Sequence, residues 1–193
     1  QFGTEYIKRN NSDKLLYSKM VMWEKILKST HNLRSIKEFG CSVGLNLEAL
    51  KKLNPKFSLL GYEINKDACL EASRKNIAKI YNKSIIDKIS DEPSDLTFTA
   101  GVLIHINPDY LNKVYENLVN CSSRYIVIAE YYNPTPVSVT YRGHQDKLFK
   151  RDFAGELMSE FELGLIDYGF IYKRDELAPQ DDITWFLLEK KIK

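Results

Sequence analysis

The spacing of apolar residues predicts helices that alternate with short, continuously apolar strands. The expected helices cover residues 12–29, 47–53, 67–80, 109–120 and 153–161. The expected strands cover residues 35–39, 57–62, 81–86, 95–100, 125–129, 163–172 and 183–190. Continuous apolar strands that alternate with helices indicate a parallel sheet covered on both faces.

The most informative segment runs from a strand into a glycine turn and then into a helix. Gly40, Ser42 and Gly44 form this turn, and the next apolar run ends on Glu63, nineteen residues after Gly44. Such a layout is typical of a nucleotide-binding βαβ unit, in which glycines let the backbone approach the ligand and the acid accepts hydrogen bonds from ribose hydroxyls. We expect Asn46 to cap the helix that follows the turn.

Composition and charge narrow the function classes. The chain has 193 residues, 44% of them hydrophobic and 28% charged, as in an ordinary globular protein. A net charge of +2 argues against a nucleic-acid partner, and the absence of an apolar run of about 18 residues argues against a membrane span. Three widely spaced cysteines suggest reduced thiols in the cytoplasm and no metal site.

Polar residues follow two of the expected strands and are candidates for acceptor chemistry. His105 follows the fourth strand, where an imidazole could act as a general base. A packing role for this histidine is the alternative. Glu130, Tyr131 and Asn133 come off the fifth strand and should face the crevice beyond the carboxyl ends of the strands. Glu130 could orient an amine or accept a hydroxyl proton, or it could be tied to the loop backbone.

A basic, aromatic-rich connection follows Glu130. Its cations could hold a phosphate or carboxylate, with arginine giving bidentate contacts, or could form a solvated surface. We predict that His144 takes part in catalysis and that the remaining candidates bind the acceptor. These are Tyr131, Asn133, Tyr141, Arg142, Lys147 and Arg151.

The segment from Glu38 to Gly44, together with Glu63, resembles the cofactor motifs of class I S-adenosylmethionine-dependent methyltransferases. Ser42 stands where that family usually has the central glycine. The resemblance implies a Rossmann-like α/β fold, with one mostly parallel seven-stranded sheet, an antiparallel last strand and helices on both faces. It also implies a cofactor site. The residues it assigns to that site are Glu38, Phe39, Gly40, Cys41, Ser42, Gly44, Asn46, Glu63, Ile64, Ser84, Ile85, Ala100, Gly101 and Val102.

Long strings at both ends of the chain resemble a narrower group, the methylases associated with pseudaminic acid biosynthesis. These strings cover residues 2–10, 141–144, 148–155 and 179–185. The association implies an acceptor that is a sugar, a sugar nucleotide or a glycan. We expect one domain over residues 1–193, with residues 1–30 as a helical lid that brings Tyr6 and Arg9 over the cofactor. Residues 131–160 would form an insertion that faces the substrate.

These observations predict a methyltransferase that binds S-adenosyl-L-methionine, releases S-adenosyl-L-homocysteine and acts on a small polar acceptor, without a metal. The alternatives are a methyltransferase acting on RNA or protein, a non-catalytic module of the same fold, and an NAD-dependent oxidoreductase. Ser42 and the lack of a second substrate domain disfavour the oxidoreductase. The oligomeric state is left open.

Overall fold

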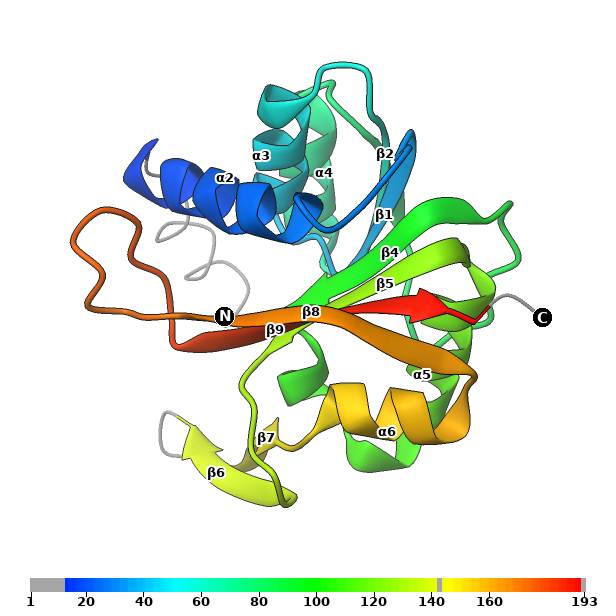
Figure 1. The fold of residues 1–193 in the computed structure, drawn as a ribbon, viewed down its shortest axis with the longest axis vertical. Helices are drawn as coiled ribbons and strands as arrows, with labels where there is room; N and C mark the ends of the chain where they lie inside the picture. Colours follow the sequence, from blue (N-terminus) through cyan, green and yellow to red (C-terminus); the bar gives the residue numbers. More distant parts are fainter. Residues whose placement is uncertain (1–12, 142–143, 192–193) are drawn as a thin grey trace.

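The computed structural model describes residues 13–141 and 144–191, and its main feature is a seven-stranded sheet (Figure 1). The strands lie in the order β3-β2-β1-β4-β5-β9-β8, and β9 alone is antiparallel to its neighbours. This confirms the predicted mostly parallel sheet with an antiparallel last strand. The strands are β1 (Ser35–Phe39), β2 (Ser58–Glu63), β3 (Lys79–Asn82), β4 (Ser94–Ala100), β5 (Ser122–Glu130), β8 (Leu163–Ile171) and β9 (Ile183–Lys190).

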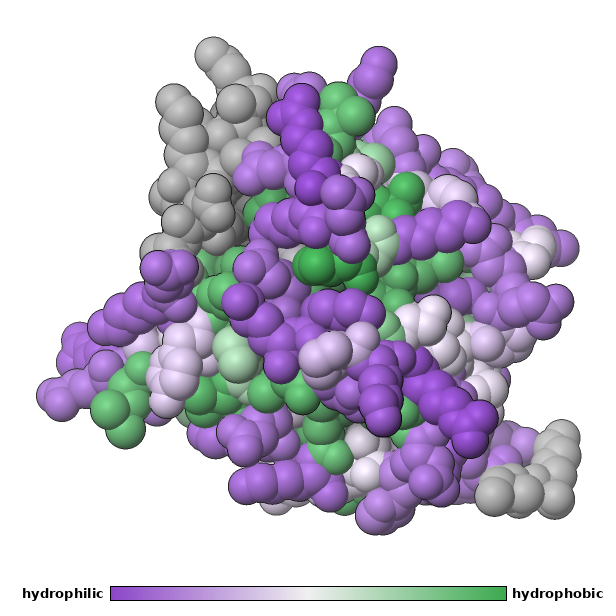
Figure 2. All heavy atoms as spheres, turned by 90° about the horizontal axis from the view of Figure 1, so that it is seen from above, coloured by the Kyte–Doolittle hydropathy of each residue, from purple (hydrophilic) through white to green (hydrophobic). Residues whose placement is uncertain are grey.

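Helices cover both faces of the sheet. Helices α2 (Asp13–Leu27), α3 (Leu45–Leu53) and α4 (Lys66–Arg74) lie on one face, and α5 (Leu111–Asn120) and α6 (Phe153–Glu160) lie on the other (Figure 1). Seen from above, the outer surface of the first layer is mostly hydrophilic with small apolar islands (Figure 2). The apolar side chains of α2, α3, α5 and α6 are buried in the core clusters against the sheet. Among the described residues, no helix has the length and apolar content to cross a membrane.

Strand β5 has apolar side chains on both faces of the sheet, so a layer of helices is needed on each face to bury them. Val127 and Ala129 lie in the core cluster that contains α2 and α3, whereas Ile126 and Ile128 lie in the cluster that contains α5 and α6. Successive residues of a strand point to opposite faces, so a continuously apolar strand must be covered twice. The expected covering of both faces is confirmed.

Helix α2 is part of this core. Its Met22, Trp23 and Ile26 are fully buried, and the ring of Trp23 meets Phe98 of β4 edge to face with 4.5 Å between centroids. The Ser29 hydroxyl, just beyond α2, donates to the Asp167 carboxylate of β8 at 2.7 Å. Residues 13–27 are thus packed as a structural layer on the sheet.

Two predicted boundaries are wrong. The helix expected to reach residue 80 ends at Arg74, and the strand expected at 81–86 lies at Lys79–Asn82. Asn76 adopts the left-handed conformation with a φ of 53°, which an α-helix cannot continue through. The apolar Ile77, Ala78 and Ile80 belong to the following turn and strand instead, although their spacing suits a helix.

The connection after β5 contains a hairpin that the sequence did not predict. Strands β6 (Val137–Tyr141) and β7 (His144–Lys150) pair antiparallel, apart from the main sheet. Leu148 is buried in the core cluster of α5 and α6, and β7 lies against the 3-10 helix η1 (Leu103–His105) that follows β4. The hairpin is therefore anchored beside the carboxyl end of β4 (Figure 1).

Replacing Leu187 by Ala should lower the free energy of unfolding by about 2–5 kcal/mol, because this fully buried side chain of β9 would leave a cavity. Urea denaturation measures the effect, with an unchanged dependence on denaturant concentration. The matched control is Leu165→Ala on the edge strand β8, where the side chain is 45% exposed. That change should stay within about 0.5 kcal/mol of wild type, and equal losses at the two positions would contradict this packing.

Candidate functional site at the carboxyl ends of the parallel strands

The turn after β1 is held by the neighbouring strand. The backbone amides of Gly40 and Cys41 both donate to the carbonyl oxygen of Tyr62 at 2.9 Å. Gly40 and Gly44 have φ values of 82° and 75°, and Ser42 also has a positive φ, of 48°. These values are natural for glycine and rare for other residues. The turn therefore needs its two glycines and holds Ser42 in a left-handed conformation.

Gly40 also lies against the segment that follows β4. A Cβ atom on Gly40 would be 2.7 and 2.8 Å from the two methyl carbons of Val102. Gly101, in contrast, has a φ of 70° but nothing within 4 Å of where its Cβ would be. The absence of a side chain at Gly40 lets the turn after β1 pack onto the turn after β4.

Glu63 joins the end of β2 to the glycine turn, as its spacing predicts. Its carboxylate accepts a hydrogen bond from the Ser42 amide at 2.7 Å and another from the Asn65 amide at 2.7 Å. Ile64 beside it is 71% exposed. The acid predicted to bind ribose hydroxyls and the apolar side chain predicted to stack on adenine thus share one edge of the turn.

Glu38 lies near the end of β1, two residues before Gly40. It is 1% exposed, and its Oε1 accepts from the Asn46 side-chain amide at 2.6 Å, which in turn accepts from the Trp23 indole at 3.4 Å. The predicted capping role of Asn46 is wrong, because Gly44 occupies the N-cap position and the Asn46 side chain points to Glu38. Glu38 Oε2 is buried and has no hydrogen-bond partner within the described part of the chain. Burial raises the pKa of Glu38 to about 8.

Glu130, at the end of β5, presents a second carboxylate. Its Oε1 accepts from the backbone amides of Val102 and Leu103 at 3.0 and 3.1 Å. The residue is 2% exposed, and for its buried Oε2 the described residues offer only the neighbouring Thr99 hydroxyl as a donor. Burial raises the pKa of Glu130 to about 7, against the opposing effect of hydrogen bonds from the backbone amides and from the Thr99 hydroxyl. The reading of Glu130 as a carboxylate tied to the loop backbone is confirmed for Oε1, and its role toward an acceptor stays a prediction.

Lys19 of α2 faces these carboxylates, and the sequence analysis missed it. Burial lowers the pKa of Lys19, while the charges of Glu38, Asp181 and Glu130 oppose this shift. The available signal was a charged residue inside the apolar stripe of the helix, one turn before the buried Met22 and Trp23. A lysine in that stripe needs an anionic environment.

Gln180, in the loop between β8 and β9, was missed as well. Its side-chain amide donates to the Ser18 carbonyl of α2 at 3.0 Å, and its Oε1 is buried without a partner. No sequence pattern marks this contact between residues 162 positions apart. The loop and α2 together form one side of the site.

Several other residues predicted to bind the cofactor have side chains that are buried in the hydrophobic core or bonded within their own loop. Phe39 and Ile85 are buried in the cluster of α5 and α6, and Cys41 is buried in the cluster of α2 and α3. Burial also raises the pKa of the Cys41 thiol. Ser84 accepts from the Ile86 amide at 3.2 Å within the loop after β3, and Ala100 ends β4. The backbones of these residues and the partly exposed Ser84 hydroxyl remain candidates for ligand contact.

The predicted acceptor residues are only partly brought together. His105 ends η1 and is exposed. Tyr131 follows Glu130 and lies under the Lys150 ammonium, 5.2 Å from the ring centroid. Asn133 donates to the Thr135 carbonyl at 2.5 Å, and Arg151 forms an ion pair with Glu156 at 2.5 Å. Asn133 and Arg151 are thus engaged with their own loop and with α6.

Several predicted residues lie outside the described part of the chain. Tyr6, Arg9 and Arg142 are outside it, as are the side chains of Tyr141, His144 and Lys147. Within residues 13–141 and 144–191, no group of three or more His, Cys, Asp or Glu side chains could hold a metal ion.

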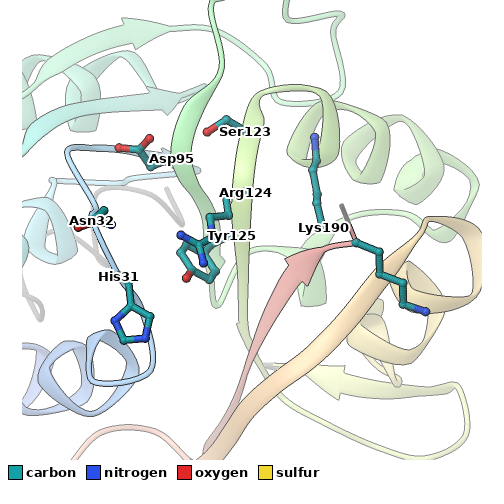
Figure 3. Close-up of a pocket in the computed structure, with 8 residues that line it drawn as sticks. His31, Asn32, Asp95, Ser123, Arg124, Tyr125 and Lys190 are labelled. Carbon is teal, nitrogen blue, oxygen red and sulfur yellow. The ribbon is translucent and has the colours of Figure 1, made fainter. Parts of the chain in front are cut away.

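A pocket of about 520 Å³ lies at the opposite end of the sheet, where β4 and β5 begin (Figure 3). Three of its charged side chains, those of Arg124, Lys190 and Asp95, already have partners. Arg124 contacts Glu189 at 2.6 Å, Lys190 donates to the Ser122 carbonyl at 2.5 Å, and Asp95 accepts from the backbone amide of Ser35 at 2.9 Å. No buried group there lacks a partner, so the carboxyl end of the sheet is the better candidate site.

Gly40→Ala should destabilise the fold more than Gly101→Ala, by about 1–3 kcal/mol, because only the first methyl overlaps Val102. Both variants carry the cost of a positive φ, so the comparison isolates the steric contact. Urea denaturation measures both. Adding Val102→Ala to Gly40→Ala should restore most of the difference, and no restoration would show that the overlap is not the cause.

The raised pKa values predict a pH dependence of stability. In the unfolded chain Glu38 and Glu130 titrate near 4.3, so between about pH 4.3 and pH 8 the folded protein holds protons that the unfolded chain has released. Stability should therefore fall as pH rises through this window. Glu38→Gln should remove part of this fall. The urea midpoint of the variant should therefore rise relative to that of wild type between pH 5 and pH 9. If the urea midpoints of wild type and Glu38→Gln changed with pH in parallel, this would contradict the raised pKa of Glu38.

Comparison with known proteins agrees with this architecture. No family model matches the chain, and no curated protein sequence does either. Solved structures do match. A TehB-like S-adenosylmethionine-dependent methyltransferase from Corynebacterium glutamicum is 18% identical, with a TM-score of 0.69 over 98% of both chains. The sugar N-methyltransferase KedS8 from Streptoalloteichus is 10% identical, with a TM-score of 0.72 over 98% of this chain and 93% of that one.

A third match carries a ligand. The O-methyltransferase of a trans-AT polyketide synthase from Brevibacillus brevis, in complex with S-adenosyl-L-homocysteine, is 15% identical. Its TM-score is 0.68 over 89% of this chain and 74% of that one. At these identities the similarity is one of fold. The chain has the class I methyltransferase fold.

Proposed function

We propose that this protein transfers the methyl group of S-adenosyl-L-methionine to a small polar acceptor. The observation that carries the proposal is the pair of carboxylates, Glu38 and Glu130, that flank the glycine turn. Each is almost fully buried, and each has one oxygen to which no described residue donates a well-oriented hydrogen bond. Burying such groups is costly unless a ligand satisfies them. A cationic ligand that carries N–H donors meets this need.

The methionine end of the cofactor fits these groups. Glu38 Oε2 is an unused acceptor for its ammonium, and Lys19 is the cation that faces Glu38 and Glu130 and can receive its carboxylate. The Glu63 carboxylate can accept the hydrogen bonds that ribose hydroxyls donate. Beside it, the exposed side chain of Ile64 offers an apolar surface for adenine. When bound, the cofactor supplies a methyl group already activated on a sulfonium.

The protein's own contribution is placement and exclusion of water. The glycine turn, fixed to Tyr62 and packed on Val102, gives the cofactor a preformed cradle. The loop between β8 and β9 and helix α2, joined by the hydrogen bond from Gln180 to Ser18, would cover a bound cofactor on one side. Glu130 and His105 are the groups available to hold or accept a proton from the acceptor.

The acceptor is proposed to be related to a sugar, in surface-polysaccharide or nonulosonic acid metabolism. The support is the likeness of the terminal strings to methylases associated with pseudaminic acid biosynthesis, and the fold match to a sugar N-methyltransferase. The near-neutral net charge of +2 disfavours an RNA acceptor. A protein acceptor or a non-catalytic role would appear as an absence of small-molecule product.

Calorimetric titration with S-adenosyl-L-homocysteine tests the cofactor assignment. Wild type should bind, and Glu63→Ala should abolish binding. Lys19→Met and Glu38→Gln should each weaken it by about tenfold or more, because a charged hydrogen-bond partner is worth about 1.5–3 kcal/mol.

The matched control for this titration is Lys25→Met, an exposed lysine of the same helix, which should leave the affinity unchanged. Wild-type affinity in Glu63→Ala would overturn the assignment. A rise in melting temperature with NAD and none with S-adenosyl-L-homocysteine would favour an oxidoreductase instead.

A further inference from the structure

The helical cover on the α6 side of the sheet ends partway along the edge strand β8. Helix α6 packs against β8 near Leu163, which is buried in the core cluster of α5 and α6 (Figure 1). Nearer to Ile171, the same face of the sheet carries exposed aromatic side chains. These are Tyr168, Phe170 and Tyr172, together with Tyr132 beyond β5, and they are between 42% and 65% exposed.

These rings join Phe186 of β9 in one surface, which we call the aromatic strip. Tyr132 and Tyr168 each lie beside Phe186, with 5.7 and 6.4 Å between ring centroids. Phe170 and Tyr172 extend the strip, and their centroids are 6.1 Å apart. An aromatic side chain can bury about 150–250 Å², so four rings that are roughly half exposed present about 400 Å². A standard interface takes about 800 Å² from each partner, of which about 57% is apolar. The strip therefore matches the apolar area that one copy contributes to a stable dimer.

We propose that the aromatic strip is the interface of a symmetric homodimer, in which two copies pack their strips together with their β8 strands antiparallel. A two-fold axis brings the same patch of both copies together, so this surface needs no second kind of partner. Aromatic rings are enriched at the centre of such interfaces, where they pack offset or edge to face. The inference goes beyond the methyltransferase activity and does not depend on which acceptor is methylated.

Opposite charges at the two ends of β8 favour the antiparallel arrangement. The three residues before the strand include the exposed Glu160 and Glu162, and the three residues after it include the exposed Lys173 and Arg174. Lys173 also pairs with Asp182 at 3.3 Å on the surface. Antiparallel strands bring the acidic end of one copy to the basic end of the other, whereas parallel strands would bring like charges together.

The contact uses the face of β8 and not its backbone edge. The pairing of β8 with β9 shifts register between Leu165 and Asp167, and the Asp167 carboxylate accepts from the Tyr168 amide at 2.8 Å. A bulge and a charged side chain are features that keep an edge strand from pairing with another strand. The surface left for association is therefore the face that carries the rings.

Sedimentation velocity of the full chain over a range of micromolar concentrations tests the interface. Wild type should sediment as a dimer, with twice the 22.4 kDa mass of the chain. Tyr168→Lys places a charge within the strip and should raise the dimer dissociation constant at least about thirtyfold, as expected for the loss of an aromatic hot spot. The matched control is Leu70→Lys, at an exposed apolar position of α4 on the other face of the sheet, which should leave dimerisation unchanged.

Charge reversal tests the direction of the strands. Arg174→Glu should weaken the dimer, because it would meet the acidic end of the second copy, and adding Glu162→Lys should restore most of the affinity. A double variant weaker than the single one would overturn the antiparallel arrangement. A monomeric wild type, or a dimer that Tyr168→Lys leaves intact, would overturn the interface. A monomer in which Tyr168→Lys weakens binding of the methyl acceptor would also overturn it and would assign the strip to the substrate.

Discussion

The site depends on one bifurcated backbone contact, in which the amides of Gly40 and Cys41 share the carbonyl oxygen of Tyr62. This contact ties the turn after β1 to the end of β2, where Glu63 accepts from the Ser42 amide. It also sets Gly40 against Val102, the residue whose amide donates to Glu130. The ends of β1, β2, β4 and β5 are thus joined by main-chain amides and by the carboxylates of Glu63 and Glu130 that accept from them. Side chains then need little freedom to form the cofactor site.

The buried polar groups of this arrangement lower the stability of the fold. Carboxylates such as Glu38 and Glu130, with unpartnered oxygens, are unfavourable in a closed interior. Trp23 and Asn46 orient Glu38 from the helical layer, and the amides of η1 orient Glu130. The sheet core, with β5 buried on both faces, supplies the stability that permits this. Local strain of this kind is expected where a protein is organised for a ligand.

The sequence predicted the parts of the site that are local in the chain. The strand, the glycine turn and the acid at Glu63 follow from periodicity and spacing, and the parallel sheet follows from its apolar strands. Asn46 was misassigned, since a helix start and a buried polar contact can use the same residue type. The hairpin of β6 and β7 was missed because its sequence is polar and is anchored through Leu148. Lys19 was detectable as a charge in the apolar stripe of α2, but its anionic neighbours were not, and Gln180 left no signal because its partner is 162 residues away.

The contact between Gln180 and Ser18 has a consequence for how the protein is made. It joins residues 162 positions apart, and strand β9, which follows Gln180 directly, lies between β5 and β8. On the ribosome, the first strands and helices can form early, but β8 has no neighbour in the sheet until β9 emerges. One wall of the site is therefore completed only after residues 180–190 have been synthesised. A nascent chain of this fold exposes the edge of β5 and stays without a closed cofactor site until its last strand inserts.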